Sequence, residues 1–339
     1  MKTLTRRAFL GNAAATLAAA CARRRPATRG MDSAVLAQGL AYVGSAGKEL
    51  HSLLVVRDGQ LLSETYWPPY ERNQKHVLNS CTKAFVSALT GIASDGGLLR
   101  EDDAVLKYFP EETPRNLDDA KKAITIKHLL TMSSGISWPQ SGPDNVSDQM
   151  GKSRDWVKFI LDRPMAAAPG AVTNYSNGDS HLLSAIIGKV TGFPALEFAH
   201  KRLFGPLGID DVRWDADPQG RSIGSAALYM RPVDMTKLGL LYLASGAWNG
   251  QRVLSADWVR KSFTAHTKMP ARGGAADYGY YFWLYPERKL FEAWGGAGQR
   301  IGMFPELGVA VVMTASIGDD IPRSAFAGTI YDYVLQATK

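Results

Sequence analysis

The distribution of strand signals is the feature that most constrains what this chain can fold into. Residues 51–57 and 60–66 read as two strands, and Asp58-Gly59 between them is typical of a hairpin turn. Signals of this kind return near the C-terminus, where aromatic and β-branched residues gather at 278–285, 299–304 and 309–315. From about residue 102 to 215 they are nearly absent. The pattern predicts one antiparallel sheet that draws its strands from both ends of the chain.

Helical periodicity fills most of the remaining sequence. Between residues 102 and 215 the helical segments are short, and loops rich in Gly, Pro, Ser and Asp separate them. We expect helices at residues 31–42, 80–93, 126–132, 155–161, 180–190, 195–203, 232–244, 255–262 and 322–336. The sequence therefore predicts an α+β fold with an antiparallel sheet, flanked by N- and C-terminal helices, and an inserted all-helical domain. Residues 31–105 and 216–339 would form the sheet domain, and residues 106–215 the insertion.

The net charge of +7 resides entirely in the first 30 residues. This segment carries seven of the 39 Lys and Arg residues and none of the 32 Asp and Glu residues, so the rest of the chain is formally neutral. A neutral body without a basic cluster argues against a nucleic-acid partner. In the segment itself, Arg6-Arg7 precedes an apolar run from Ala8 to Ala20, which resembles a bacterial twin-arginine export signal. We expect residues 1–30 to be a leader and the protein to be exported to the periplasm.

The two cysteines lie in different settings. Cys21 closes the run Ala18-Ala19-Ala20-Cys21, which looks like a lipoprotein cleavage box but has no Leu three residues before the Cys. Cys21 is therefore a candidate lipid anchor. Cys81 lies in an apolar stretch and has no partner once the leader is removed, so we expect no structural disulfide. Neither cysteine joins a metal-ligand pattern with the six histidines, and we expect no metal and no cofactor.

The pattern Ser-x-x-Lys occurs twice and suggests a nucleophilic serine with a lysine base. Ser45 and Lys48 lie in a glycine turn, where a rigid geometry is not expected. Ser80 and Lys83 open a predicted helix, so both side chains share one face. Apolar neighbours around Lys83 would lower its pKa, which a lysine needs before it can act as a base. The alternative, in which Ser80 caps a surface helix and Lys83 points to solvent, fits the local sequence equally well.

Two further motifs are candidates for chemistry. Tyr175-Ser176-Asn177 precedes an apolar helix; its phenol could move a proton, and its amide could hold Lys83 or a substrate. The alternative is an ordinary turn that ends in a helix cap. Residues 220–224 match the nucleophile-elbow pattern around Ser222, but a loop precedes them where the elbow needs a strand. We interpret that match as coincidental. No spacing selects a histidine for a Ser-His-Asp triad, and the triad stays open.

Taken together, four segments resemble the serine β-lactamase-like hydrolases. The similarity is greatest to the class C-like branch that contains carboxylesterases and 6-aminohexanoate-dimer hydrolase. Leu-Asn-Ser-Cys-Thr-Lys-Ala-Phe at residues 78–85 resembles the nucleophile motif, and the Tyr175 motif resembles the family's Y-x-N segment. Residues 124–135 and 228–243 resemble other stretches of the family. The likeness extends over about residues 35–335.

The resemblance implies acyl transfer in a cleft between a sheet domain and a helical domain. Ser80 would attack a carbonyl and form an acyl-enzyme, while Lys83, assisted by Tyr175, takes its proton. Tyr175 would then protonate the leaving group and later activate the deacylating water. The backbone N–H of Ser80 and an N–H from a C-terminal strand would hold the oxyanion. Asn177 would hold Lys83 or the substrate.

The third motif of the family is altered in this chain. Lactamases carry Lys-Thr-Gly on a strand beside the nucleophile, whereas residues 293–298 here read Ala-Trp-Gly-Gly-Ala-Gly. Without the cation that would attract a substrate carboxylate, we expect small carboxylic esters or linear amides as substrates. Trp294, Gly295 and Gly296 would contact them. The alternatives are a cell-wall D,D-peptidase or β-lactamase, and a non-catalytic binding or sensor protein on the same fold. The sequence leaves the oligomeric state undetermined.

Overall fold

The computed structural model describes residues 32–46, 49–140, 145–271, 274–318 and 323–338. Its central element is an eight-stranded sheet in the order β2-β1-β13-β12-β11-β10-β9-β8, with every neighbouring pair antiparallel. The strands are β1 (Leu50–Arg57), β2 (Gln60–Tyr66), β8 (Thr267–Ala271), β9 (Gly274–Tyr278), β10 (Trp283–Tyr285), β11 (Leu290–Gly295), β12 (Gln299–Phe304) and β13 (Val309–Ala315). The predicted single sheet, built from both ends of the chain, is therefore confirmed.

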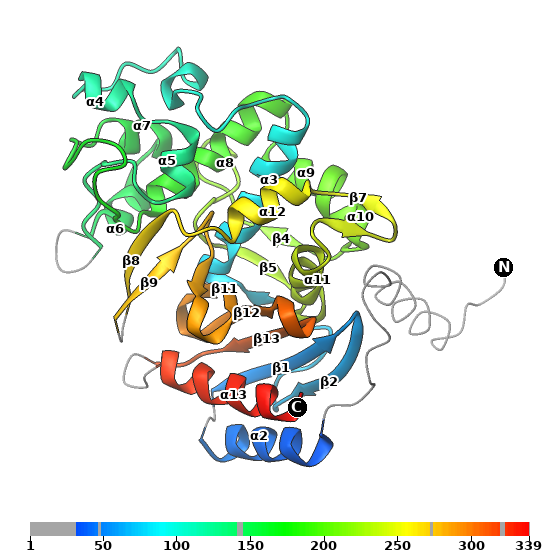
Figure 1. Ribbon diagram of the computed structural model, residues 1–339. Coiled ribbons are helices and arrows are strands. Elements are labelled where there is room, and N and C mark those ends of the chain that lie inside the picture. Colours follow the sequence, from blue (N-terminus) through cyan, green and yellow to red (C-terminus); the bar gives the residue numbers. More distant parts are fainter. Residues whose placement is uncertain (1–31, 47–48, 141–144, 272–273, 319–322, 339) are drawn as a thin grey trace.

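Helices cover the two faces of this sheet (Figure 1). The helices α2 (Ser33–Ala46) and α13 (Arg323–Ala337) pack on one face. The helices α3 (Thr82–Asp95) and α11 (Pro232–Leu243) pack on the opposite face. The side chains of β1 show why both faces must be covered. Leu53 and Val55 join one apolar cluster with α13, while Leu54 and Val56 join the other with α3. A strand that is buried on both faces reads as a continuous apolar run, as β1 does.

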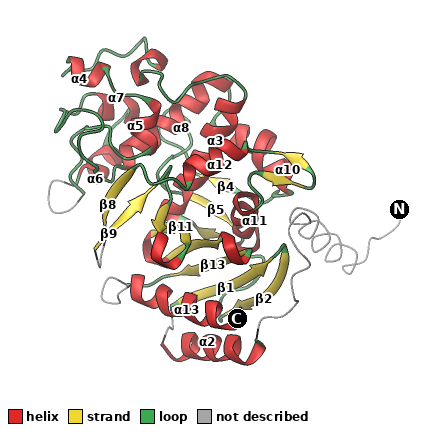
Figure 2. Cartoon of the chain, in the orientation of Figure 1, coloured by secondary structure: helices red, strands yellow, loops and turns green. Residues whose placement is uncertain are grey.

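The helices that cover the second face extend into a region almost free of strands (Figure 2). It contains α8 (Asn177–Thr191), which packs on α3 in the same apolar cluster. The shorter helices are α4 (Asp119–Lys122), α5 (Ile126–Leu130), α6 (Val146–Lys152), α7 (Trp156–Leu161), α9 (Ala195–Ala199), α10 (Gly205–Leu207) and α12 (Ala256–Ser262). A three-stranded sheet has the order β3 (His76–Val77), β5 (Leu228–Met230) and β4 (Arg213–Trp214). A separate two-stranded sheet consists of β6 (Ala247–Trp248) and β7 (Gln251–Arg252). The division into two domains at about residues 106 and 215 stays a prediction.

Several predicted elements need correction. Residues 278–285 are not one strand, because β9 ends at Tyr278 and the chain turns through Tyr281, whose φ is 68°. The strands β8 and β11 were missed; β11 contains Glu292, a charged residue that masks an apolar pattern but is buried against Arg300. The N-terminal helix was expected to end at Tyr42, before the glycine turn, but it extends through Gly44 to Ala46, since one helical glycine costs only about 1 kcal/mol.

The predicted leader and Cys21 lie outside the described residues. Cys81 is buried and free of any disulfide, and its thiol lies 3.4 Å from the carbonyl oxygens of Ala293 and Gln299. Within the described ranges, no single helix has both the length and the apolar character to cross a membrane; Asn177–Thr191 and Ala195–Leu207 meet that test only as a pair bent by 69°.

Candidate active site

Ser80 and Lys83 lie side by side at the start of α3. Ser80 belongs to a short 3-10 turn, η1 (Asn79–Cys81), and not to the α-helix itself, which begins at Thr82. The expected proximity of residues three apart nevertheless holds, since Lys83 Nζ is 3.1 Å from Ser80 Oγ. Asn79 turns the chain into this position with a φ of 45°, a conformation that asparagine adopts more readily than most residues. The Ser80 side chain is half-buried.

Lys83 is held in a dry environment with three oxygen neighbours. Its side chain is 1% exposed, and the residues around it, Leu78, Phe85 and Val86, are fully buried as predicted. Besides Ser80, Nζ lies 2.8 Å from Asn177 Oδ1 and 3.0 Å from the backbone oxygen of Ser225. Burial lowers the pKa of Lys83 to about 7, because the charged form loses its hydration. The interpretation in which Lys83 points to solvent is therefore wrong.

Tyr175 completes the polar group around Ser80. Its ring centroid lies 4.7 Å from Lys83 Nζ. Burial raises the pKa of the Tyr175 phenol well above its usual value, an effect that the Ser80 side chain partly offsets. The phenol is therefore protonated at neutral pH and can donate a proton.

The segment around Met132 positions Tyr175 from both sides. The backbone N–H of Asn174 donates to the Met132 carbonyl oxygen at 2.9 Å, and that of Ser176 lies 3.2 Å from Met132 Sδ. Ser176 then caps α8 by accepting from the Asp179 N–H. Asn177, the first residue of α8, donates through Nδ2 to Ser147 Oγ at 3.0 Å, which aims its Oδ1 at Lys83. The helix cap expected at this motif and the expected contact of its amide with Lys83 are thus both present.

Strand β11 ends beside the turn that carries Ser80. A side chain at Gly295 would place its Cβ 2.3 Å from the Leu78 carbonyl oxygen and 3.1 Å from the Cys81 nitrogen, so only glycine allows this approach. Asn79 Nδ2 donates to the Gly296 carbonyl oxygen at 2.8 Å and ties the two segments together. The structure therefore places Gly295 and Gly296 next to Ser80.

Trp294 belongs to a line of aromatic rings that leads away from Tyr175. Tyr175 stacks on Trp283 with centroids 6.2 Å apart, and Trp283 meets the half-buried Trp294 edge to face at 5.2 Å. The guanidinium of Arg300 lies 4.7 Å from the Trp294 ring centroid, but it is buried and pairs with Glu292 at 2.6 Å. The cation near the altered third motif is thus already neutralised.

Ser222, the serine of the elbow-like motif, has different surroundings from Ser80. Ser222 is buried and its Oγ accepts from the Leu196 N–H; residues 217–221, directly before it, form a turn and not a strand, so the interpretation of a coincidental match is confirmed. Ser45 lies on α2, and Lys48 lies outside the described residues. A histidine–aspartate pair does exist, with His181 Nε2 3.1 Å from Asp217 Oδ2. Its other nitrogen accepts from the Gly224 N–H at 3.4 Å, so it activates no serine.

Some features of the site gave no usable signal in the sequence. The Ser225 contact is made by a backbone oxygen, which any residue type would provide. The sequence predicted a strand that contains Trp283, but no sequence pattern indicated that its ring would stack on Tyr175. Ser147 could have been noticed only from the tertiary contact with Asn177.

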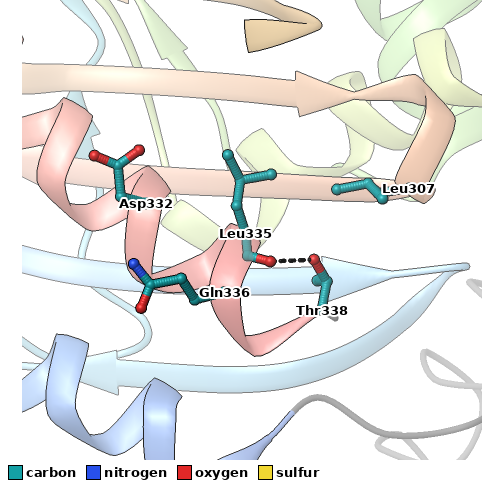
Figure 3. A pocket seen from close by; sticks show the side chains of 5 residues that line it. All are labelled: Leu307, Asp332, Leu335, Gln336 and Thr338. Carbon is teal, nitrogen blue, oxygen red and sulfur yellow. Dashed lines mark hydrogen bonds between the residues drawn. The ribbon is translucent and has the colours of Figure 1, made fainter.

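A shallow hollow on the opposite side of the sheet offers no comparable chemistry. Figure 3 shows its lining side chains, which are Leu307, Asp332, Leu335, Gln336 and Thr338. The hydroxyl of Thr338 donates to the Leu335 carbonyl oxygen at 2.8 Å, and these residues include no base beside a nucleophile. The group around Ser80 is therefore the stronger candidate for an active site.

Comparison with known proteins agrees with this geometry. A family model described as Beta-lactamase matches residues 34–333. The chain is 22% identical to a 6-aminohexanoate-dimer hydrolase of Paenarthrobacter ureafaciens, over 76% of this chain and 67% of the relative. It is 30% identical to esterase EstB of Burkholderia gladioli, but over only 44% of this chain and 41% of the esterase. The solved structure of EstCE1, a hydrolase with promiscuous acyltransferase activity, shares the fold with a TM-score of 0.76 and 16% identity, covering 89% of this chain and 98% of that one.

Proposed function

Because the chain belongs to the beta-lactamase family of serine hydrolases, we propose that it is an exported hydrolase of small carboxylic esters or linear amides. The observation that carries this proposal is the 3.1 Å contact between Ser80 Oγ and the buried Lys83 Nζ. A buried amine with a pKa near 7 is a suitable base for a serine hydroxyl at neutral pH.

Acylation begins when the Ser80 hydroxyl proton moves to Lys83 Nζ and Ser80 Oγ bonds to the substrate carbonyl carbon. The tetrahedral oxyanion is held by the Ser80 N–H and by a backbone N–H at the end of β11. One such donor stabilises the transition state by about 3 kcal/mol. The Tyr175 phenol gives its proton to the departing alkoxide or amine and regains one from the Lys83 ammonium. Water, deprotonated by the same pair, then releases the acid and frees Ser80.

The substrate class follows from what surrounds the nucleophile. Tyr175, Trp283 and Trp294 offer an aromatic surface, and the nearby Arg300 is already paired with Glu292. A substrate carboxylate would find no unpaired cation among these residues, whereas an uncharged acyl or alcohol group would bury apolar area. The relatives named as an esterase and as an amide-dimer hydrolase support the same two bond types.

A substrate panel tests this proposal. Initial rates would be measured with p-nitrophenyl acetate and butyrate, a linear amide of 6-aminohexanoate, a D-alanyl-D-alanine peptide and benzylpenicillin. We expect turnover of the esters or the linear amide, and no covalent labelling by a fluorescent penicillin. Turnover of the D-peptide or of benzylpenicillin alone would support the peptidase or lactamase alternative. No turnover of any compound by folded protein would favour a binding or sensor protein.

The rate of ester hydrolysis is expected to rise with pH. Lys83 must be uncharged to accept a proton, and burial lowers its pKa to about 7, so kcat/KM should increase through pH 7 and level off above it. The thiol of Cys81 and the phenol of Tyr175 both have raised pKa values and stay protonated over this range. A profile that is flat between pH 5 and 8 would exclude Lys83 as the base.

One other buried group near the site titrates in this range and needs a control. Burial raises the pKa of the Asp179 carboxyl to about 7, against the effect of hydrogen bonds from Ser134 and Ser176. In Asp179→Asn, the acidic limb of kcat/KM should remain near pH 7. If the acidic limb of the pH profile disappears in this variant, the titration that causes it is that of Asp179 and not that of Lys83.

We further propose that the chain reaches the periplasm through its Arg6-Arg7 leader. Cell fractionation would compare the full-length chain with a variant in which both arginines are replaced by lysine, with the new N-terminus determined by mass spectrometry. We expect the wild type in the periplasm and the variant in the cytosol; cytosolic wild type would contradict the proposal. Incorporation of labelled palmitate, absent in Cys21→Ser, would identify the lipid anchor.

A further inference from the structure

The loop that contains the elbow-like motif delivers an oxygen to the active site. It runs from Asp215 to Ser225, where the backbone oxygen of Ser225 accepts from Lys83 Nζ at 3.0 Å. Lys83 therefore has two acceptors besides Ser80, one from this loop and one from Asn177 on α8. The loop has no role in the mechanism derived above.

His181 connects this loop to α8. It lies one helical turn after Asn177 and is fully buried. Its Nε2 faces Asp217 Oδ2 at 3.1 Å, and its Nδ1 faces the Gly224 N–H at 3.4 Å. Because the Gly224 N–H can only donate, Nδ1 must be the unprotonated nitrogen, and Nε2–H donates to Asp217. One neutral imidazole thus bridges both ends of the loop.

The charged groups around His181 keep this arrangement in place. Asp217 also accepts from the backbone N–H groups of Gln219 and Arg221 and pairs with the Arg221 guanidinium at 3.3 Å. Arg221 in turn pairs with Asp155 at 3.0 Å. Burial lowers the pKa of His181 although Asp217 opposes this effect, so the ring is neutral at pH 7.

Gly224 lies directly on the backbone of α8. A Cβ at this position would come within 2.1 Å of the Ser180 carbonyl oxygen and 2.8 Å of Ser184 Cβ. Real Cβ atoms do not approach backbone oxygen so closely, so any larger residue must lift the loop away from α8. Ser184 Oγ, which donates to the Ser222 carbonyl oxygen at 2.7 Å, fastens the loop at a second point.

We propose that His181 and Gly224 are positioning residues that hold the Ser225 carbonyl against Lys83, so that the lysine lone pair points at Ser80. A neutral amine has two N–H donors and one lone pair. With its donors engaged by Asn177 and Ser225, the lone pair is left facing Ser80 Oγ–H, the proton that it must accept. His181 connects the two acceptors of Lys83, because it belongs to α8, which carries Asn177, and hydrogen-bonds to the loop that carries Ser225. This inference rests on the proposed role of Lys83 as the base.

The first test lifts the loop with Gly224→Ala. A misplacement of about 1 Å in an active site can cost about 100-fold in rate, and we expect kcat/KM for an ester substrate to fall at least tenfold. The acidic limb of its pH profile should move to lower pH, because the Lys83 ammonium loses an acceptor. The Tyr175 phenol and Cys81 thiol, the other titratable groups facing Lys83, stay protonated over this range.

A matched variant on α8 controls for general effects of adding a methyl group. A Cβ at Gly188 would meet only the Phe193 carbonyl oxygen at 3.7 Å, an ordinary contact, so Gly188→Ala should keep wild-type kinetics. Rates are normalised to the number of serines labelled by a fluorophosphonate at completion, which removes any effect of unfolded protein. If Gly224→Ala also keeps the wild-type rate and pH profile, the proposal is overturned.

Two substitutions at His181 separate its two hydrogen bonds. In His181→Asn the amide oxygen can replace Nδ1 and accept from Gly224, whereas in His181→Gln the amide nitrogen can replace Nε2 and donate to Asp217. Asp217 keeps its Arg221 and backbone partners in both variants. We expect the Asn variant to retain several-fold more activity than the Gln variant. Equal losses, or a more active Gln variant, would contradict the role of the Gly224 contact.

A direct measurement separates this inference from the proposed function. The Lys83 amine can be titrated by NMR of protein labelled with carbon-13 at lysine Cε, with the signal assigned by its absence in Lys83→Met. We expect a titration near pH 7 in the wild type and at lower pH in Gly224→Ala. If no substrate is hydrolysed, the proposed function fails while this shift still reports on the loop. If the two proteins titrate alike, the positioning role fails whatever the substrate.

Discussion

Replacing Ser80 with alanine is expected to abolish hydrolysis of every substrate that the wild type turns over. In the proposed mechanism the Ser80 hydroxyl oxygen bonds to the substrate carbonyl, and the Lys83 Nζ that would take its proton lies 3.1 Å away. Loss of a serine nucleophile lowers kcat by about 10⁶-fold in a well-studied protease, so we expect at least about 10⁴-fold here. Stability should change little, because Ser80 is half-buried and gives up only its contacts with Lys83 and Tyr175.

The chain provides its own control for this experiment. Ser45 begins the second Ser-x-x-K pattern, but it lies on α2, on the other face of the sheet. Ser45→Ala should therefore retain wild-type kcat and KM. A Ser80→Ala protein with substantial activity, measured beside an unaffected Ser45→Ala, would show that Ser80 is not the nucleophile.

Replacing Tyr175 with phenylalanine is expected to give the second largest loss. This change removes the phenol hydroxyl but keeps the ring that stacks on Trp283. General acid–base groups contribute about 100-fold to 10,000-fold, and we expect kcat to fall within that range. The loss should be greater for amides than for p-nitrophenyl esters, because an amine leaves only after it is protonated. Steady-state rates with both substrates measure this difference.

Tyr281→Phe is the matched control for the loss of a phenol. Tyr281 is a buried core residue, and its hydroxyl has no hydrogen-bond partner among the described atoms. Its removal should leave both kinetic constants close to wild type. If Tyr175→Phe stays within twofold of the wild type, Tyr175 has no part in proton transfer.

Local patterns were sufficient to predict the parts of the fold that local interactions determine. The hairpin at Asp58-Gly59 has φ values of 48° and 78°, which match the turn that this pair favours. The strands β12 and β13 are buried along their length and agree with their predicted bounds. The helix starts at Thr82 and Asn177 lie within a few residues of their predicted positions.

The missed elements depend on contacts between distant residues. Strand β11 contains Glu292, which is 1% exposed only because Arg300 and Tyr331 supply its partners from β12 and α13. No periodicity in one segment can reveal a compensated charge of this kind. For the same reason, the sequence motifs placed Ser80, Lys83 and Tyr175 in one site through a resemblance, while local reasoning left each of them open.

The family-like segments also support one another in a way that their spacing does not reveal. Met132 lies in the segment of residues 124–135, and it holds the backbone on both sides of Tyr175. The Gly295 backbone lies on the turn that carries Ser80. The Asp215–Ser225 loop then brings a carbonyl to Lys83. Lys83, the proposed base, is thus contacted by segments more than 90 residues away from it in the sequence.

Labelling with a fluorophosphonate tests the central claim most directly. The full-length protein would be treated with the reagent at pH 8, where Lys83 is uncharged, and the modified peptide mapped by mass spectrometry. Our account predicts a single adduct on Ser80 that forms more slowly at pH 6 and is absent in Ser80→Ala. An adduct on another serine, or none on folded protein, would contradict the assignment of Ser80 as an activated nucleophile.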